Sequence, residues 1–186
     1  ESDPAIGMVG CKLVQPNGEL DHACKRSFPT PLSALAHFSG IGRREEASGS
    51  LSQYRATHLG DDEPGEVDAV NGAFMLCRAE AIHEVGLLDE GYWLYMEDLD
   101  WCRRFWQAGW RVFYEPAGVA LHVKGGSSGG RRAPRQEIAF HRGMGRYTRQ
   151  QLREVLRIDS TNDYVLFCRQ DADLPAGVPD DFRRPR

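Results

Sequence analysis

The feature that most constrains this chain is the alternation of helix-like and strand-like segments between residues 67 and 123. Apolar residues at helical spacing predict helices over 78–85 and 97–108, and a glycine follows each of them, Gly86 and Gly109. Glycine is preferred just after a helix because it adopts the left-handed conformation without strain. The two glycines therefore divide this region into short elements.

Strand-like runs, rich in β-branched and aromatic residues, lie around these helices. They cover residues 6–14, 67–77 with an interruption or bulge at Asn71-Gly72, 110–114 and 119–123. The turn sequence Pro16-Asn17-Gly18 predicts a hairpin in which Leu20 starts the returning strand. Strands that alternate with helices predict an α/β fold with a mixed sheet flanked by helices.

The rest of the chain is less regular. Further expectations are a helix at 32–38, a long polar and mobile loop at about 40–66, and an amphipathic helix over 136–158 with a break near Gly143 and Gly145. Residues 1–162 are predicted to form one unit. Residues 163–186, rich in proline, aspartate and arginine, are predicted to be a frayed tail.

Composition limits the class of protein. Hydrophobic residues make up 41% of the chain and charged residues 27%, as in an ordinary globular domain. No apolar run reaches the roughly 18 residues that a transmembrane helix needs. The net charge of −4 gives no general reason to expect a nucleic-acid partner. Cys11, Cys77 and Cys102 lie inside apolar runs, which is typical of core cysteines in a reducing cytoplasm.

Arginine is frequent after Lys124, although the chain as a whole is acidic. The plainer interpretation is the solvated face of a helix. The alternative is a surface for anionic phosphates or lipid headgroups. The sequence leaves both interpretations open.

Three carboxylates, Glu97, Asp98 and Asp100, open the helix predicted at 97–108. One interpretation is local, because acids in a first turn cap free N–H groups and complement the helix dipole, and Asp100 and Arg104 are spaced for an ion pair. A second interpretation treats Asp98 and Asp100 as ligands of one metal ion. It is disfavoured because residues two apart on a helix project about 200° apart.

A third interpretation makes one of these carboxylates a general base. The aromatic run Tyr92, Trp93 and Tyr95 precedes the acids directly. An apolar wall of this kind opposes ionisation of a nearby carboxylate and offers faces on which a sugar ring can stack. The aromatic run therefore favours a base over simple capping.

His122 lies in the strand predicted at 119–123, just before a glycine- and serine-rich loop that contains Lys124 and Ser127. A lone histidine is more often a structural residue than a ligand. Its position at a strand end, however, suits a contact to the divalent metal of a diphosphate. The loop glycines allow the backbone to approach phosphate closely, and the lysine adds positive charge.

Taken together, these residues resemble family 2 glycosyltransferases of the GT-A fold, especially the bacterial rhamnosyltransferase-like and galactofuranosyltransferase-like members. The matching blocks follow one another along the chain. They are residues 70–76 with Arg78, 85–90, 95–104, 108–112, 114–116, and His122 with Gly125, Gly126 and Ser127. Residues 3–10, 12–14, Gly18 and 28–29 resemble the family more loosely.

The resemblance implies a role for each matching residue. Asp98 is expected to be the base that deprotonates the acceptor hydroxyl in an inverting transfer, Glu97 to help hold the acceptor, and His122 to join the Mn²⁺ or Mg²⁺ of the donor diphosphate. The remaining substrate contacts are expected from Asn71, Gly72, Ala73, Trp93, Tyr95, Lys124 and Ser127.

The implied partners are a nucleotide-sugar donor and a glycan or lipid-linked saccharide acceptor, with no nucleic acid. The implied location is the cytoplasm, with a peripheral position at the inner face of the membrane. In this family the nucleotide-binding half comes first, so residues 1–162 are expected to be the acceptor-side half of a partial GT-A fold, with little or no activity alone. The alternative is a non-catalytic carbohydrate- or partner-binding module with the same half-fold.

Overall fold

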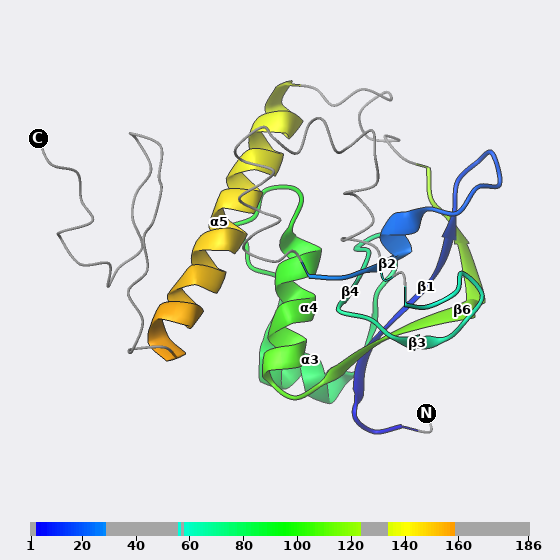
Figure 1. The fold of residues 1–186 in the computed structure, drawn as a ribbon, viewed down its shortest axis with the longest axis horizontal. Helices are drawn as coiled ribbons and strands as arrows, with labels where there is room; N and C mark the ends of the chain where they lie inside the picture. Colours follow the sequence, from blue (N-terminus) through cyan, green and yellow to red (C-terminus); the bar gives the residue numbers. More distant parts are fainter. Residues whose placement is uncertain (1–2, 29–55, 57, 124–133, 159–186) are drawn as a thin grey trace, which may run out of the picture.

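The computed structural model describes residues 3–28, 56, 58–123 and 134–158 (Figure 1). The helix expected at 32–38 and the tail at 163–186 lie outside these residues. The described elements, in chain order, are β1 (Ile6–Val14), the 3-10 helix η1 (His22–Cys24), β2 (Lys25–Arg26), β3 (Gly65–Glu66), β4 (Ala69–Val70), β5 (Leu76–Cys77), α3 (Ala79–Val85), α4 (Glu97–Gln107), β6 (Arg111–Leu121) and α5 (Pro134–Ile158).

The described strands form two sheets. The larger has the order β3-β6-β1-β5, and in it β1 and β6 run parallel while the outer strands are antiparallel to their neighbours. The smaller pairs β2 with β4. This arrangement confirms the predicted α/β fold with a mixed sheet flanked by helices, and it is consistent with a partial GT-A fold.

The strands expected at 110–114 and 119–123 form one strand, β6. The prediction of two separate strands was therefore wrong. β6 follows β1 along most of its length, but the pairing shifts between Cys11 opposite Glu115 and Lys12 opposite Val119. The extra residues, which include Pro116, bulge out of the ladder. Proline lacks a backbone N–H, and a bulge is one of the few places where a sheet accepts it.

The run at 67–77 is also not one strand. Its first part, β4, pairs with β2, whereas its second part, β5, pairs with β1. A turn separates β4 from β5, and in it the Phe74 amide donates a hydrogen bond to the Asn71 carbonyl oxygen (3.1 Å). The predicted interruption at Asn71-Gly72 is therefore a crossing from one sheet to the other.

The hairpin expected after Gly18 is reduced to a single bridge between Val14 and Leu20. The chain leaves the sheet at Asp21, whose carboxylate accepts a hydrogen bond from the Ala23 amide and caps η1. This local capping competes with continuation of the strand.

Helix α3 is capped by Gly86, and α4 ends at Gln107, two residues before Gly109; both glycines have a positive φ. The inner face of α4 buries Leu99, Cys102 and Phe105 against the sheet. Burial of a side chain as large as Phe105 contributes about 1.5–3 kcal/mol. The amphipathic pattern thus correctly predicted which face of α4 packs.

Part of the predicted 40–66 loop is packed on the body of the domain. Ala56 is fully buried, and residues 65–66 form β3. The ammonium of Lys25 donates to the carbonyl oxygens of Leu59 (2.6 Å) and Gly60 (2.8 Å). Residues 40–55 and residue 57 lie outside the described part of the chain.

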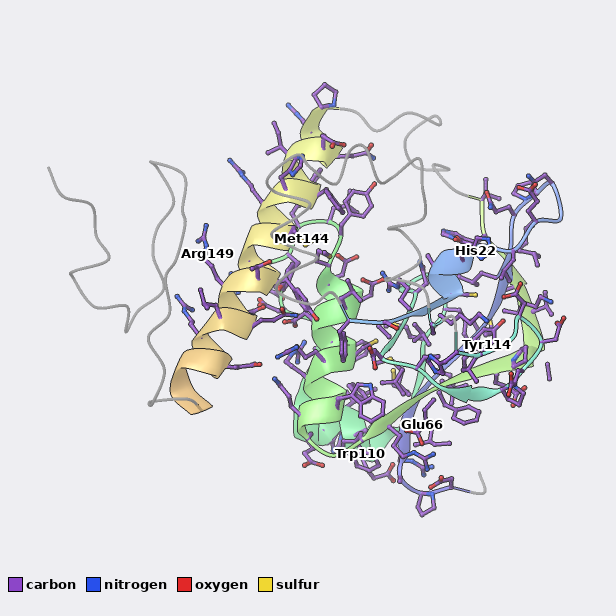
Figure 2. All side chains as sticks on the ribbon, in the orientation of Figure 1. His22, Glu66, Trp110, Tyr114, Met144 and Arg149 are labelled. Carbon is purple, nitrogen blue, oxygen red and sulfur yellow. The ribbon has the colours of Figure 1, made fainter. Side chains whose placement is uncertain are left out.

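The long helix α5 runs beside α4, which lies between α5 and the sheet (Figure 1). Its inner side buries Met144 and Tyr147, while Arg149 lies on its outer side (Figure 2). Glu154 accepts hydrogen bonds from Arg103 and Gln107 of α4. Among the described helices, none combines the length and apolarity needed to cross a bilayer.

The break expected near Gly143 and Gly145 was wrong, because α5 is continuous through both residues. A Cβ at Gly143 would lie 2.8 Å from the carbonyl oxygen of Tyr95, whereas a Cβ at Gly145 would meet nothing within 4 Å. Gly143 is thus required by the close approach of α5 to the residues that precede α4.

Gly143→Ala and Gly145→Ala are expected to change stability in opposite directions. Alanine at 145 gains up to about 1 kcal/mol of helix propensity. Alanine at 143 gains the same propensity but forces α5 away from Tyr95, and such overpacking costs about 1–3 kcal/mol. Urea unfolding of both variants measures the difference. Equal stabilities would contradict the close approach.

Candidate active site

Asp98 lies in the first turn of α4 with its side chain only 12% exposed. Its Oδ2 accepts a hydrogen bond from Nη2 of Arg26 (2.6 Å) and another from the amide of Gly72 (3.1 Å). Its Oδ1 accepts from the amide of Leu99 (2.8 Å). The carboxylate is therefore held in one orientation by groups from β2, the turn after β4, and α4.

Asp100 has a separate environment. Its Oδ2 accepts from Nε of Arg104 (2.9 Å), the predicted i,i+4 pair, and Arg104 also donates to the carbonyls of Val85 and Leu87. Burial raises the pKa of Asp100, against the opposing effect of Arg104. Asp98 and Asp100 thus diverge as helix geometry predicts, and the described residues contain no cluster of three or more side chains that could bind a metal.

The turn at Asn71, Gly72 and Ala73 lies directly against Asp98. Oδ1 of Asn71 accepts from the Ala73 amide (2.8 Å), which closes the turn and leaves the Gly72 amide aimed at the carboxylate. Gly72 and Ala73 are exposed. The fold therefore brings these three predicted acceptor-side residues together with the predicted base.

Glu97 is an unusual carboxylate. Its Oε2 is buried and has no hydrogen-bond partner among the described residues. Burial raises the pKa of Glu97, and the negative charge of Asp98 raises it further. The carboxylate keeps a hydrogen bond to its own backbone and the attraction of Arg26, but a buried oxygen without a partner costs free energy, and carboxylates with a shifted pKa are concentrated at functional sites.

Glu97→Gln is expected to stabilise the chain at neutral pH. A carboxyl group whose pKa is higher in the folded state binds its proton more tightly when folded, so its contribution to stability falls as the pH rises above about 4.3, the value in an unfolded chain. Glutamine cannot ionise and avoids this loss. Urea unfolding at pH 4 and pH 7 should show a gain at pH 7 only, and Glu90→Gln, at an exposed position, controls for net charge.

The backbone before α4 is strained. Tyr95 (φ 68°) and Met96 (φ 73°) both adopt the left-handed conformation, which costs a non-glycine residue about 1–3 kcal/mol. The Tyr95 ring packs edge-on against Phe140 of α5, with centroids 6.1 Å apart. Strain of this kind is concentrated at functional sites, and here it sets the direction in which Glu97 and Asp98 leave the loop.

Trp93 is 72% exposed. No described contact joins it to Asp98, so its stacking on a sugar stays a prediction. The other predicted aromatic contact, Tyr95, is two residues from Glu97 and half-buried.

His122 lies directly after β6, whereas the strand was expected to extend through it to 123, and its Nδ1 lies 2.7 Å from Oδ2 of the fully buried Asp21. A carboxylate behind an imidazole fixes the ring orientation, and metal-binding histidines usually have such a support. The geometry therefore fits His122 as one metal ligand. Lys124 and Ser127, expected to contact phosphate, lie outside the described residues.

The segment from Asp21 to Arg26 was missed by sequence reasoning, although it connects the two parts of the site. Asp21 supports His122, and Arg26, five positions later, binds Asp98. Five residues span at most about 17 Å, which limits the separation of the Cα atoms of Asp21 and Arg26. No local pattern marks either residue, because their partners are 101 and 72 positions away in the sequence.

Cys102 lies one helical turn after Asp98 and is fully buried. Burial raises the pKa of its thiol to about 12. A thiol with such a pKa is not a nucleophile at neutral pH. Cys102 and Cys11 are buried core residues, as predicted, whereas Cys77 is only partly buried; Cys24 is buried as well.

Comparison with known proteins gives relatives of one kind, although no protein-family model matches the chain. The chain is 32% identical over 140 residues to N-acetylglucosaminyl-diphospho-decaprenol L-rhamnosyltransferase from two strains of Mycobacterium tuberculosis, which covers 74% of this chain and 43% of the relative. It is 45% identical over 56 residues to rhamnosyltransferase WbbL of Escherichia coli K12, which covers 30% of this chain and 21% of the relative.

These similarities confirm the resemblance to glycosyltransferases that the sequence motifs predicted. Within that class the relatives are bacterial rhamnosyltransferases, and the similarity to the mycobacterial one extends over 74% of this chain. The chain spans less than half the length of the curated relatives that it matches.

Proposed function

We propose that this chain is the acceptor-side part of an inverting glycosyltransferase that moves a sugar, with rhamnose the first candidate, from a nucleotide-diphosphate donor to a hydroxyl of a lipid-linked or other glycan acceptor. The observation that carries the proposal is Asp98, held at the start of a helix beside the exposed turn at Gly72 and Ala73. The names of the rhamnosyltransferase relatives support the choice of reaction and sugar.

In this mechanism Asp98 removes the proton of the acceptor hydroxyl. The acceptor oxygen then bonds to the anomeric carbon from the face opposite the nucleotide diphosphate, which departs with the electrons of the broken bond. Oδ1 of Asp98 is the better proton acceptor, because it accepts one hydrogen bond, from the Leu99 amide, whereas Oδ2 accepts from both Arg26 and Gly72. Arg26 supplies the positive charge that accompanies an ionised base.

Glu97 is proposed to hold the acceptor. Its Oε2 accepts no hydrogen bond from the described residues but is buried, so a sugar hydroxyl would donate to it only after the Glu97 side chain turns toward the acceptor. Asn71 and Ala73 would line the same side. Trp93 and Tyr95 are proposed to contact the sugar faces.

A divalent metal, Mn²⁺ or Mg²⁺, would offset the charge on the departing diphosphate. His122 is the described residue that fits as a ligand, with Asp21 fixing its ring. Lys124 and Ser127 are proposed to contact the phosphates. A cytoplasmic location at the inner face of the membrane, and no nucleic-acid partner, complete the proposal.

The test uses the longest natural form of the protein that contains this chain. It is incubated with Mn²⁺ or Mg²⁺, a panel of nucleotide-diphosphate sugars that includes dTDP-rhamnose, and a polyprenyl-diphosphate N-acetylglucosamine acceptor. Mass spectrometry of the lipid product should show addition of one deoxyhexose, and NMR an inverted anomeric centre. Binding of saccharide without transfer from any donor would instead indicate a non-catalytic module.

A further inference from the structure

The outer face of α5 carries an arginine stripe, defined here as Arg135, Arg142, Arg146, Arg149 and Arg153. At about 100° per residue these positions fall within about 60° of one another, and they extend over about 27 Å of helix. All five are exposed. The structure places the side chains of two acids of α5, Glu137 and Glu154. Both lie outside the face that carries the stripe.

Within the described residues, most of the stripe has no counter-charge. Arg146 binds Asp89, but no ion pair joins the other four arginines to any described residue. A concentration of positive charge on one helix face stands out in a chain whose net charge is −4. A solvated helix face usually intersperses both signs, whereas this one has a single sign.

The loop at 87–93, called the apolar loop for its exposed aliphatic and tryptophan side chains, lies beside the stripe and also contains Asp89 and the exposed Glu90. Arg146 donates to Asp89 through Nε (3.0 Å) and Nη2 (2.6 Å), and its guanidinium covers the ring of Tyr92 at 5.3 Å. The same loop exposes Leu87 (75%), Leu88 (45%) and Trp93 (72%). Exposed aliphatic and tryptophan side chains next to arginines are typical of a surface that enters the headgroup region of a bilayer.

We propose that the arginine stripe and the apolar loop at 87–93 dock this domain on an anionic phospholipid bilayer. The phosphates of the bilayer complement the stripe, and the apolar loop inserts beside them. A nucleic acid would match the charge but would leave the aliphatic side chains in water. The inference rests on the proposed function in one respect, since an enzyme with a lipid-linked acceptor works at a membrane surface.

The experiment is flotation of the chain with vesicles. The chain is expected to float with phosphatidylglycerol-containing vesicles, not with pure phosphatidylcholine, and to dissociate as salt rises. Each basic residue near an anionic surface strengthens binding about fivefold, so Arg149→Gln/Arg153→Gln should weaken it about 30-fold. Leu87→Ser/Leu88→Ser should weaken it at unchanged charge.

Two controls separate the stripe from general effects. Arg149→Lys/Arg153→Lys keeps the charge and should keep most of the binding. Lys12→Gln removes a cation from β1, outside the stripe, and should leave the binding unchanged. Circular dichroism and thermal unfolding check that each variant is folded.

Equal flotation with neutral vesicles, no flotation, or full binding by the glutamine variant would overturn the proposal. Tighter binding to single-stranded RNA than to anionic vesicles at the same salt concentration would also overturn it and assign the stripe to nucleic acid. Vesicle binding needs no catalysis, so these results are independent of whether sugar transfer is found.

Discussion

Replacement of Asp98 by Asn is expected to reduce sugar transfer by about 10²–10⁴-fold, the range that a general base contributes. The amide keeps an oxygen that can accept from Arg26 and Gly72, so the site should retain its shape, but it cannot take a proton. The measurement is the initial rate of glycolipid formation by the longest natural form of the protein. Donor affinity, measured by titration, should change little.

Asp100→Asn is the matched control. It removes a carboxylate from the same turn of α4. The partner of this carboxylate is Arg104, whereas Asp98 contacts the turn at Gly72. We expect it to lower stability and to leave transfer within a few-fold of the parent when assayed well below the unfolding temperature. Normal turnover by the Asp98 variant, or an equal loss in both variants, would remove Asp98 from its proposed role.

Arg26→Met is expected to produce the second large effect, a loss of about 3 kcal/mol in the free energy of unfolding. The ion pair is mostly buried, with Arg26 and Asp98 only 16% and 12% exposed. Removal of one partner leaves the other charge buried without compensation, which typically costs about 3–5 kcal/mol. The lower end of this energy range is expected for Arg26→Met, because the Gly72 and Leu99 amides still donate hydrogen bonds to Asp98. Urea unfolding provides the measurement.

The double variant Arg26→Met/Asp98→Asn sharpens this test. With both charges gone, the desolvation penalty disappears, so the double variant should be more stable than Arg26→Met alone. Lys12→Met breaks the exposed pair with Asp62 and should have a much smaller effect. An Arg26→Met variant as stable as the parent would show that the ion pair does not organise the site.

The sequence predicted the helical part of the site well. α4 begins at Glu97 and is followed by Gly109, and α3 ends at Gly86, because caps and amphipathic spacing are local properties. Strands were predicted less well. β4 and β5 were expected to be one element and β6 two, since strand pairing depends on partners that are distant in the sequence.

The acidic start of α4 is the feature that the sequence by itself determined most fully. The 3.6-residue period separates Asp98 from Asp100 whatever the rest of the chain does, and Asp100 binds Arg104 within the same helix. Only the tertiary structure decided what Asp98 contacts. Arg26 reaches it across 72 positions and Asp21 reaches His122 across 101, and contacts at such separations follow from packing of the whole chain. The sequence therefore predicted the candidate base but not the groups that orient it.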